Sequence, residues 1–305
     1  MSNLKGLIIR SQSGFFTVQT ECGPLVCKLR GRLKKSARHG DLVAIGDRVE
    51  VSPLDETTGM IESVAPRRSM ISRRTPTSRE STLSEYQQII MANVDQAVFV
   101  FACARPEPHL RMLDRFLVIA EKQEIPAVVV ANKLDLVDMD QAQDLFGPYA
   151  AIGYPVIYTS VVTGAGLKEL HEQLTGVISA LSGPSGVGKS SLLNAIQPGL
   201  GLAIHKVSQT TGKGQHTTVL SEMFALEHGG YVADTPGLKS LALWDIKPEE
   251  VDGYFPELKA LVADCQFNDC THLHEPGCAV RQAVLSGLVH PERYTSYVHL
   301  RCGEE

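Results

Sequence analysis

A glycine-rich octapeptide at residues 183–190, Gly-Pro-Ser-Gly-Val-Gly-Lys-Ser, has the residue types and spacing of a phosphate-binding loop. Its glycines permit turns that direct successive backbone N–H groups at phosphate oxygens, and the N-terminus of a following helix adds positive potential. Lys189 is expected to contact the β- and γ-phosphates of a nucleotide, and the Ser190 hydroxyl to bind Mg²⁺. The alternative is a plain glycine-rich turn ahead of a helix. The predicted contacts are Gly183, Pro184, Ser185, Gly186, Val187, Gly188, Lys189, Ser190 and Ser191.

A second motif, Asn132-Lys133-x-Asp135, follows the apolar run 127–131, which is typical of a buried strand. The motif is therefore expected at the carboxyl end of a strand, where open α/β sheets bind ligands. The Asp135 carboxylate can accept hydrogen bonds from both the ring N–H and the exocyclic amine of guanine, a donor pair that adenine lacks. Ser160, after the predicted strand 156–158, is expected to lie in a second base-contacting loop; an ordinary polar loop is the alternative.

The residues Asp234-Thr-Pro-Gly237 also follow a predicted strand, residues 230–233. Asp234 is expected to hold Mg²⁺ through water, and the Gly237 N–H to meet the γ-phosphate. Leu238 comes next, where many GTPases place a glutamine that orients the attacking water. Intrinsic hydrolysis is therefore expected to be slow unless another group orients this water.

The glycine-rich polar segment 212–218 lies between the phosphate loop and Asp234 and is typical of a switch loop. Either Thr217 or Thr218 would complete the Mg²⁺ shell when the γ-phosphate is present, and the sequence does not choose between them. His216 is a candidate for orienting the attacking water. The alternatives are a flexible loop with no switch role, and a histidine with no catalytic role.

These motifs occur in a rotated order, because the guanine-reading motif precedes the phosphate loop along the chain. In most GTPases the phosphate loop comes first. Residues 85–240 alternate predicted strands and helices, and positions 110, 113, 116, 117 and 120 form an apolar stripe at helical spacing. The sequence therefore predicts an α/β GTPase domain that is circularly permuted.

A cluster of soft metal ligands, Cys265-x4-Cys270-x-His272-x5-Cys278, lies in the C-terminal part of the chain. Three thiolates and one imidazole can close a tetrahedral zinc site, and coordination by protein ligands alone is typical of a structural ion. His274 is an alternative to His272, and four unligated side chains are the simpler possibility. Because such a short segment buries little core, zinc is expected to supply much of its folding energy.

Around these motifs the chain is expected to divide into four parts. Residues 1–68 show short alternating runs typical of a small OB-type β-barrel, and 69–84 are rich in arginine and expected to form a basic linker. Residues 85–240 form the predicted GTPase domain, and 241–305 a mainly helical zinc-binding domain. The first 80 residues carry 14 Lys and Arg against 8 Asp and Glu, whereas the rest carry 15 against 26. The N-terminal part therefore suits a polyanionic partner.

The composition is that of a soluble globular protein, with 43% hydrophobic and 21% charged residues and a net charge of −5. No apolar run reaches membrane-spanning length, and the first residues lack the apolar core of a signal peptide. We therefore expect a cytoplasmic protein without a membrane partner. In that compartment seven cysteines favour thiols or metal binding over disulfides.

The whole arrangement resembles the RsgA family of circularly permuted GTPases. The order of motifs, the preceding barrel and the following cysteine–histidine cluster carry the resemblance over essentially the full chain. The base loop near Ser160 lacks the alanine and lysine usual there, and Pro184 stands where many members have another residue. The strings that match are residues 93–96, 183–190, 214–218, 234–237 and 269–278.

The resemblance implies a GTP hydrolase that acts in late maturation of the small ribosomal subunit, with turnover stimulated by that subunit. It also implies rRNA contacts through the barrel and the zinc-binding domain, GTP and GDP as ligands with Mg²⁺, one structural zinc ion, and a monomer. Other functions stay open from the residues alone: an RNA-binding scaffold with a non-catalytic nucleotide site, an ATPase, or a GTPase acting on tRNA or the large subunit.

Overall fold

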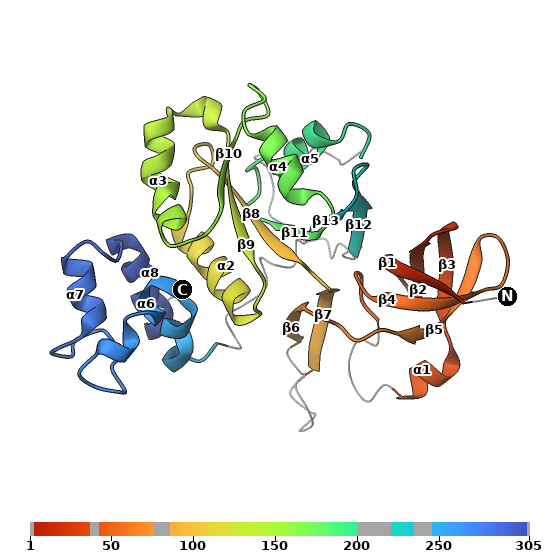
Figure 1. The fold of residues 1–305 in the computed structure, drawn as a ribbon, viewed down its shortest axis with the longest axis horizontal. Helices are drawn as coiled ribbons and strands as arrows, with labels where there is room; N and C mark the ends of the chain where they lie inside the picture. Colours follow the sequence, from red (N-terminus) through yellow and green to blue (C-terminus); the bar gives the residue numbers. More distant parts are fainter. Residues whose placement is uncertain (1–2, 37–42, 76–85, 201–220, 235–245, 304–305) are drawn as a thin grey trace, which may run out of the picture.

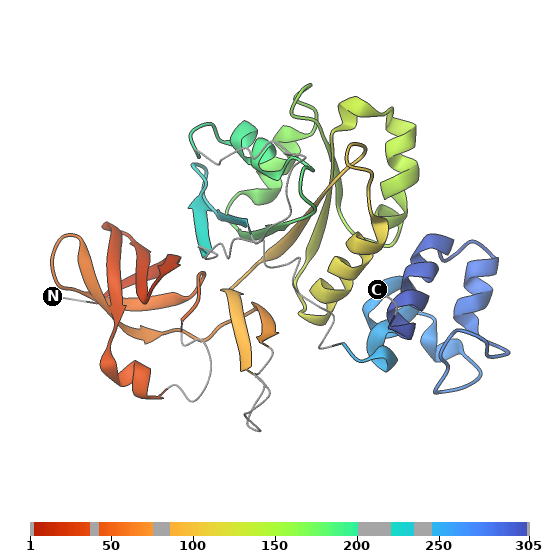
Figure 2. The same ribbon diagram turned by 180° about the vertical axis from the view of Figure 1, so that it is seen from behind.

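The computed structural model describes residues 3–36, 43–75, 86–200, 221–234 and 246–303. An N-terminal barrel, a central α/β domain and a helical C-terminal unit follow one another, with the barrel and the C-terminal unit on opposite sides of the central domain (Figures 1 and 2). The multidomain fold predicted from the sequence is thus confirmed. Within these ranges no helix combines the length and the apolar character needed to cross a bilayer.

Five short strands close into the N-terminal barrel. Strand β1 pairs with β2 on one side and with β4 on the other, so the order around the barrel is β1-β2-β3-β5-β4. Alternate side chains face inward, and Ile8, Val18 and Ile61 are fully buried. This is the strand order of an OB-type barrel, as predicted. The elements are β1 (Leu4–Gln12), β2 (Phe15–Thr20), β3 (Gly23–Leu29), α1 (Gly31–Ser36), β4 (Arg48–Pro53) and β5 (Thr58–Val64).

A two-stranded hairpin connects the barrel to the central domain. Strand β6 (Met70–Thr75) pairs antiparallel with β7 (Tyr86–Ala92). The predicted linker 69–84 therefore differs from expectation over residues 70–75, because their backbone is paired in a sheet. The β-branched and apolar residues around Ile71, which is 1% exposed, provide the packing for this strand.

The central domain is built on a mostly parallel sheet with the order β10-β9-β8-β11-β13-β12. Strand β12 is antiparallel to β13, as expected for a hairpin, whereas the other neighbours are parallel. Strands β8, β9 and β11 are buried along their whole length, which explains their continuous apolar runs. The strands are β8 (Gln96–Ala102), β9 (Ala127–Asn132), β10 (Val156–Thr159), β11 (Ile178–Ser182), β12 (Ser221–Ala225) and β13 (Tyr231–Asp234).

Helices cover both faces of this sheet. Leu113, Phe116 and Phe146 of the first two helices pack on one face, and Leu170 and Leu192 of the other two pack on the opposite face. The carboxyl ends of the parallel strands are left to the connecting loops, where ligands bind in this fold. The helices are α2 (Leu110–Lys122), α3 (Met139–Ala151), α4 (Leu167–Leu174) and α5 (Lys189–Ile196).

The C-terminal unit is helical, as predicted, and packs against α2 (Figure 1). Its core consists of Val251, Phe255, Val280 and Tyr297, joined by Val118 of α2. The elements are η4 (Pro248–Tyr254), α6 (Pro256–Lys259), η5 (Val262–Asp264), α7 (Ala279–Leu285) and α8 (Pro291–Cys302).

Two contacts join the barrel to the central domain. The buried Asn93 side chain accepts a hydrogen bond from the Arg68 N–H (3.0 Å) and donates one to the Gly46 carbonyl (2.9 Å). Strand β1 also pairs with β12, with Arg10 opposite Glu222. Asn93 therefore ties the end of the barrel to the hairpin, while β1 extends the central sheet by direct strand pairing.

Candidate nucleotide-binding site and metal centre

The phosphate loop lies between the carboxyl end of β11 and the first turn of α5, as predicted. Two glycines are required there by close contacts. A Cβ on Gly183 would lie 2.1 Å from the Val100 carbonyl oxygen, and a Cβ on Gly188 would lie 2.6 Å from Nδ2 of Asn132. Gly188 also has φ +99°, a conformation that L side chains rarely adopt. The loop backbone therefore packs directly on β8 and on the Asn132 side chain.

Lys189 folds back over this loop. Its Nζ donates to the carbonyl oxygens of Gly183 (2.8 Å) and Pro184 (3.0 Å). The ammonium group is thus held beside the loop amides, where a phosphate chain would supply stronger, charged acceptors. Ser190 follows in the first turn of α5, as its predicted role at Mg²⁺ requires.

The second predicted motif is hydrogen-bonded to the phosphate loop. Asn132, at the end of β9, is 2% exposed and donates from Nδ2 to the Val187 carbonyl (2.8 Å). Its Oδ1 accepts from Thr159 Oγ1 (3.0 Å). Lys133 Nζ donates to the Gly186 carbonyl (2.7 Å). The structure therefore brings together two segments more than 50 residues apart and fixes the spacing between a base-contacting and a phosphate-contacting loop.

Lys133 also donates to the backbone carbonyl of Arg105, in the loop between β8 and α2. Partial burial lowers the pKa of Lys133, and the nearby Asp135 carboxylate opposes this shift. The sequence analysis did not identify the 103–109 loop as part of this site. The contact is made through a backbone carbonyl, which any residue type provides, so the sequence holds no signal for it.

Ser160 lies against Asp135, so the two predicted base loops adjoin. Its hydroxyl donates to Asp135 Oδ1 (2.5 Å) and accepts from the N–H groups of Val162 and Thr163 (both 3.2 Å). Ser160 is completely buried, whereas Asp135 is exposed. The serine therefore holds one carboxylate oxygen, leaving the other free to accept from a ligand.

The remaining predicted nucleotide residues are described only in part. Asp234 ends β13, and its backbone pairs with Leu181 of β11, next to the phosphate loop. Its side chain is outside the described atoms. His216, Thr217, Thr218 and Gly237 lie outside the described residues, and their roles stay predictions.

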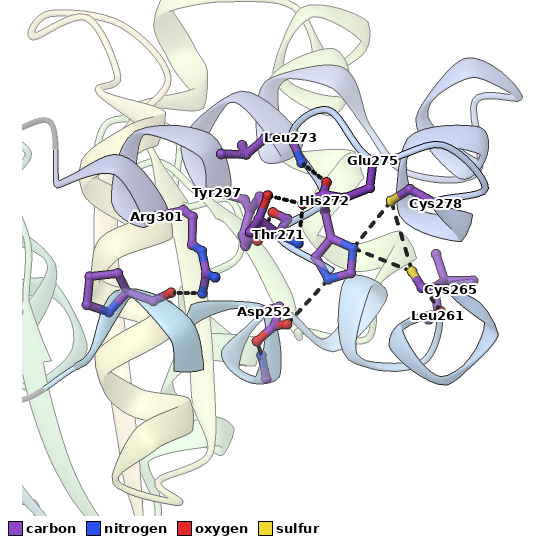
Figure 3. A network of polar contacts seen from close by, with 12 residues as sticks. Asp252, Leu261, Cys265, Thr271, His272, Leu273, Glu275, Cys278, Tyr297 and Arg301 are labelled. Carbon is purple, nitrogen blue, oxygen red and sulfur yellow. Dashed lines mark hydrogen bonds and ion pairs between the residues drawn. The ribbon is translucent and has the colours of Figure 1, made fainter. Parts of the chain in front are cut away.

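The second predicted site is a compact group of three thiols and one imidazole (Figure 3). The ligand atoms of Cys265, Cys270, His272 and Cys278 all lie within 4.8 Å of one another. His272 Nδ1 is 3.3 Å from Cys278 Sγ and 3.5 Å from Cys265 Sγ. Zinc–ligand bonds of about 2.0–2.3 Å give separations of about 3.3–3.8 Å between ligand atoms. The donor set and its spacing therefore fit a tetrahedral zinc ion.

The geometry distinguishes His272 from His274 as the ligand. His272 is fully buried, with φ +60°, and its Nε2 lies 3.3 Å from Asp252 Oδ2. A carboxylate on the far ring nitrogen fixes the tautomer that presents Nδ1 to a metal. His274 is exposed and outside the group. Burial raises the pKa of the Cys270 thiol to about 12, so metal binding at neutral pH must displace its proton.

Glu275 organises the loop that carries two of these ligands, a role the sequence analysis missed. Its carboxylate accepts from the Thr271 hydroxyl and from the N–H groups of Thr271 (2.8 Å), Leu273 (3.1 Å) and His274 (3.1 Å). These bonds, led by that of the Thr271 hydroxyl, hold the pKa of Glu275 well below its usual range. The Tyr294 hydroxyl donates to the His272 carbonyl (2.6 Å). The string His-Glu-Pro-Gly before Cys278 was the available signal.

Comparison with known proteins matches both the barrel and the central domain. The RsgA N-terminal domain family matches residues 5–61, and the RsgA GTPase family matches residues 64–244. The chain belongs to the RsgA GTPase family. It is a GTP hydrolase, and the resemblance stated from the sequence motifs is confirmed.

Relatives in the RsgA family cover nearly the full chain. "Small ribosomal subunit biogenesis GTPase RsgA" of Gemmatimonas aurantiaca is 48% identical over 300 residues, which cover 97% of this chain and 96% of the relative. "Small ribosomal subunit biogenesis GTPase RsgA 2" of Bacteroides thetaiotaomicron is 40% identical over 302 residues, again 97% and 96%. The chain therefore aligns with these RsgA proteins from the barrel to the zinc-ligand cluster.

Solved structures of similar fold agree with the architecture. The crystal structure of YjeQ from Thermotoga maritima is 38% identical, with a TM-score of 0.78, and the match covers 99% of both chains. YloQ, described as a circularly permuted GTPase, is 31% identical, with a TM-score of 0.76, covering 99% of this chain and 95% of that one. The permuted order predicted from the motifs is thus the order of the RsgA fold.

Proposed function

We propose that this RsgA-family GTPase binds the small ribosomal subunit, assists its late maturation, and hydrolyses GTP faster when bound there. The observation that carries the proposal is near-complete alignment, at 48% identity, with a relative whose name assigns it to small-subunit biogenesis. The protein acts as a cytoplasmic monomer, with units at residues 1–68, 69–84, 85–240 and 241–305. The excess of Lys and Arg in the first 80 residues supports rRNA contacts through the barrel, and the zinc-binding unit adds a second rRNA contact.

GTP binds along the line from Asp135 to Lys189. The free carboxylate oxygen of Asp135 and the Ser160 loop hold guanine. The amides of residues 183–191 and the Lys189 ammonium stabilise charge on the β–γ bridge and the γ oxygens. Mg²⁺ would be held by Ser190, by Asp234 through water and by Thr217 or Thr218, and it neutralises charge on the β- and γ-phosphates. The Gly237 N–H contacts the γ-phosphate, and His216 orients the attacking water.

The pairing of β1 with β12 supports stimulation by the subunit. Strand β12 begins three residues after the predicted switch segment 212–218, and the barrel strand β1 is hydrogen-bonded beside it. A ribosomal contact that shifts or steadies the barrel therefore acts on the strand that leaves the switch. One structural zinc ion, held by the three cysteines and His272, stabilises the C-terminal unit.

The test is GTP turnover measured in parallel with purified small subunits, large subunits and tRNA. Stimulation by small subunits alone is the expected result. Equal turnover with and without small subunits, or stimulation only by large subunits or tRNA, would reject the proposal. Replacement of Lys189 by Ala is the control for contaminating GTPases, because it removes the cation at the γ-phosphate.

A further inference from the structure

The outer face of strands β1–β3 of the barrel carries an exposed aromatic ring among cations. The register places Phe16 opposite Cys27, so their neighbours Phe15 and Lys28 share the outer face at the same end of the sheet. Phe16 and Cys27 are buried in the barrel core, whereas Phe15 is 45% exposed and Val26 is 47% exposed. The alternation of these strands therefore leaves apolar surface where solvent-facing polar residues are usual.

Lys28 lies over the Phe15 ring. Its Nζ is 4.7 Å from the ring centroid, within the range of a cation–π interaction. The ammonium covers one face of the ring, and the exposure of Phe15 leaves further ring surface open. An aromatic plane beside a cation is the combination that binds a nucleotide, because the ring stacks on a base and the cation attracts its phosphate.

Further cations continue from this end of β3. Arg30 and Arg32 both bond Glu62, the latter at 3.3 Å, and their side chains are 53% and 67% exposed, so two guanidinium groups share one carboxylate. On β1, Arg10 donates to Gln12 (3.3 Å). The excess positive charge beside the ring complements a polyanion rather than an acidic side chain at one point.

We infer that this face, centred on Phe15, binds an unpaired stretch of RNA, with a base stacked on the ring and phosphates held by Lys28 and the arginines at the end of β3. The inference rests on the proposed function and names the form of RNA that the barrel accepts. In an A-form duplex the base faces are covered by their neighbours, and an aromatic side chain reaches only unstacked bases. Contact with a protein instead of RNA is an outcome of the test below.

The test uses the full-length protein and a fluorescently labelled unpaired RNA of about 12 nucleotides, a length within the site size of one OB fold. The same sequence annealed to its complement is the duplex probe. Phe15→Leu keeps an apolar side chain without a π face, Phe15→Trp enlarges the π face, and Lys28→Ala removes the cation. Lys5→Ala is the matched charge control, because Lys5 is an exposed lysine at the other end of β1.

We expect Phe15→Leu to weaken binding of the unpaired probe about tenfold, since one base–aromatic stack is lost. Phe15→Trp should bind at least as tightly as the wild type, and Lys28→Ala should be weaker and less salt-dependent. Lys5→Ala should match the wild type. Thermal unfolding of each variant checks that the barrel is intact, as expected for exposed positions.

Equal affinity of the wild type for unpaired and duplex probes, no binding of the unpaired probe, or loss with Phe15→Leu no greater than with Lys5→Ala would overturn the inference. Sedimentation with small subunits separates it from the proposed function. Wild-type protein that sediments with small subunits, while Phe15→Leu binds unpaired RNA normally, overturns only the inference and points to a protein contact at this face. Wild-type protein that neither sediments with small subunits nor is stimulated by them overturns the proposed function.

Discussion

Arg293 of α8 and Asp114 of α2 form a buried ion pair, with Nη1 2.6 Å from Oδ1 and both side chains at most 2% exposed. Glu257 of α6 accepts from the same guanidinium (2.8 Å), and the Phe255 ring lies 4.5 Å from its central carbon. Burial alone would lower the pKa of Arg293, but the two carboxylates outweigh it and raise the pKa. One arginine therefore fastens the zinc-binding unit to the central domain.

Replacing Arg293 with Met should lower the free energy of unfolding by about 3–5 kcal/mol, because two buried carboxylates lose their partner. Denaturant unfolding followed by circular dichroism measures this. The matched control is Lys168→Ala, which breaks the exposed pair of Lys168 with Glu172 and should cost less than about 0.5 kcal/mol. Similar costs for the two variants would show that the buried pair contributes no more than a surface one.

The ligand choice at the metal centre predicts opposite effects for two neighbouring histidines. His272→Gln should abolish stoichiometric zinc, because it removes both the Nδ1 ligand and the contact with Asp252. His274→Gln should retain one zinc ion per chain, since this side chain is exposed and outside the cluster. Atomic emission analysis of the purified variants measures the metal. Loss of zinc in His274→Gln alone would assign the ligands the other way.

Glu275 should affect zinc retention without touching the metal. Glu275→Gln replaces an anionic acceptor of four hydrogen bonds by a neutral amide, which weakens the turn between Cys270 and Cys278. We expect about a tenfold loss of zinc affinity, as for other residues that support metal ligands. Competition with a chromogenic chelator measures it, and Glu292→Gln, at an exposed position on α8, is the control. Unchanged affinity would make the Glu275 contacts incidental to the metal.

The local motifs were predictable from the sequence, and the contacts between units were not. The phosphate loop and the cysteine–histidine spacing have strict residue requirements within a few positions, so they can be recognised without coordinates. The Arg293–Asp114 pair joins residues 179 positions apart, and β6 is formed by arginine- and serine-containing residues that resemble a linker. No short-range periodicity encodes either, because both depend on which surfaces meet in the folded chain.

The guanine pocket makes a prediction about nucleotide choice. Asp135→Asn should shift preference from GTP toward xanthosine triphosphate, because the amide can donate to the exocyclic oxygen of xanthine. Ser160→Ala should keep guanine preference but weaken GTP binding about fivefold to tenfold, since the carboxylate loses the bond that orients it. Fluorescent nucleotide competition measures both. Asp140→Asn, an exposed change on α3, is the control. Unaltered preference in Asp135→Asn would mean that this side chain does not read the base.

The pairing of β1 with β12 predicts a variant that separates basal from stimulated turnover. Glu222→Lys places a second cation opposite Arg10, and like charges on facing strands destabilise the pair by up to about 1 kcal/mol. Basal GTP hydrolysis should stay near the wild-type rate, because the phosphate and base loops are untouched, whereas stimulation by small subunits should fall severalfold. Glu227→Lys makes the same charge change in the exposed turn between β12 and β13 and should leave stimulation intact. Full stimulation in Glu222→Lys would show that the barrel does not act on the switch through this strand.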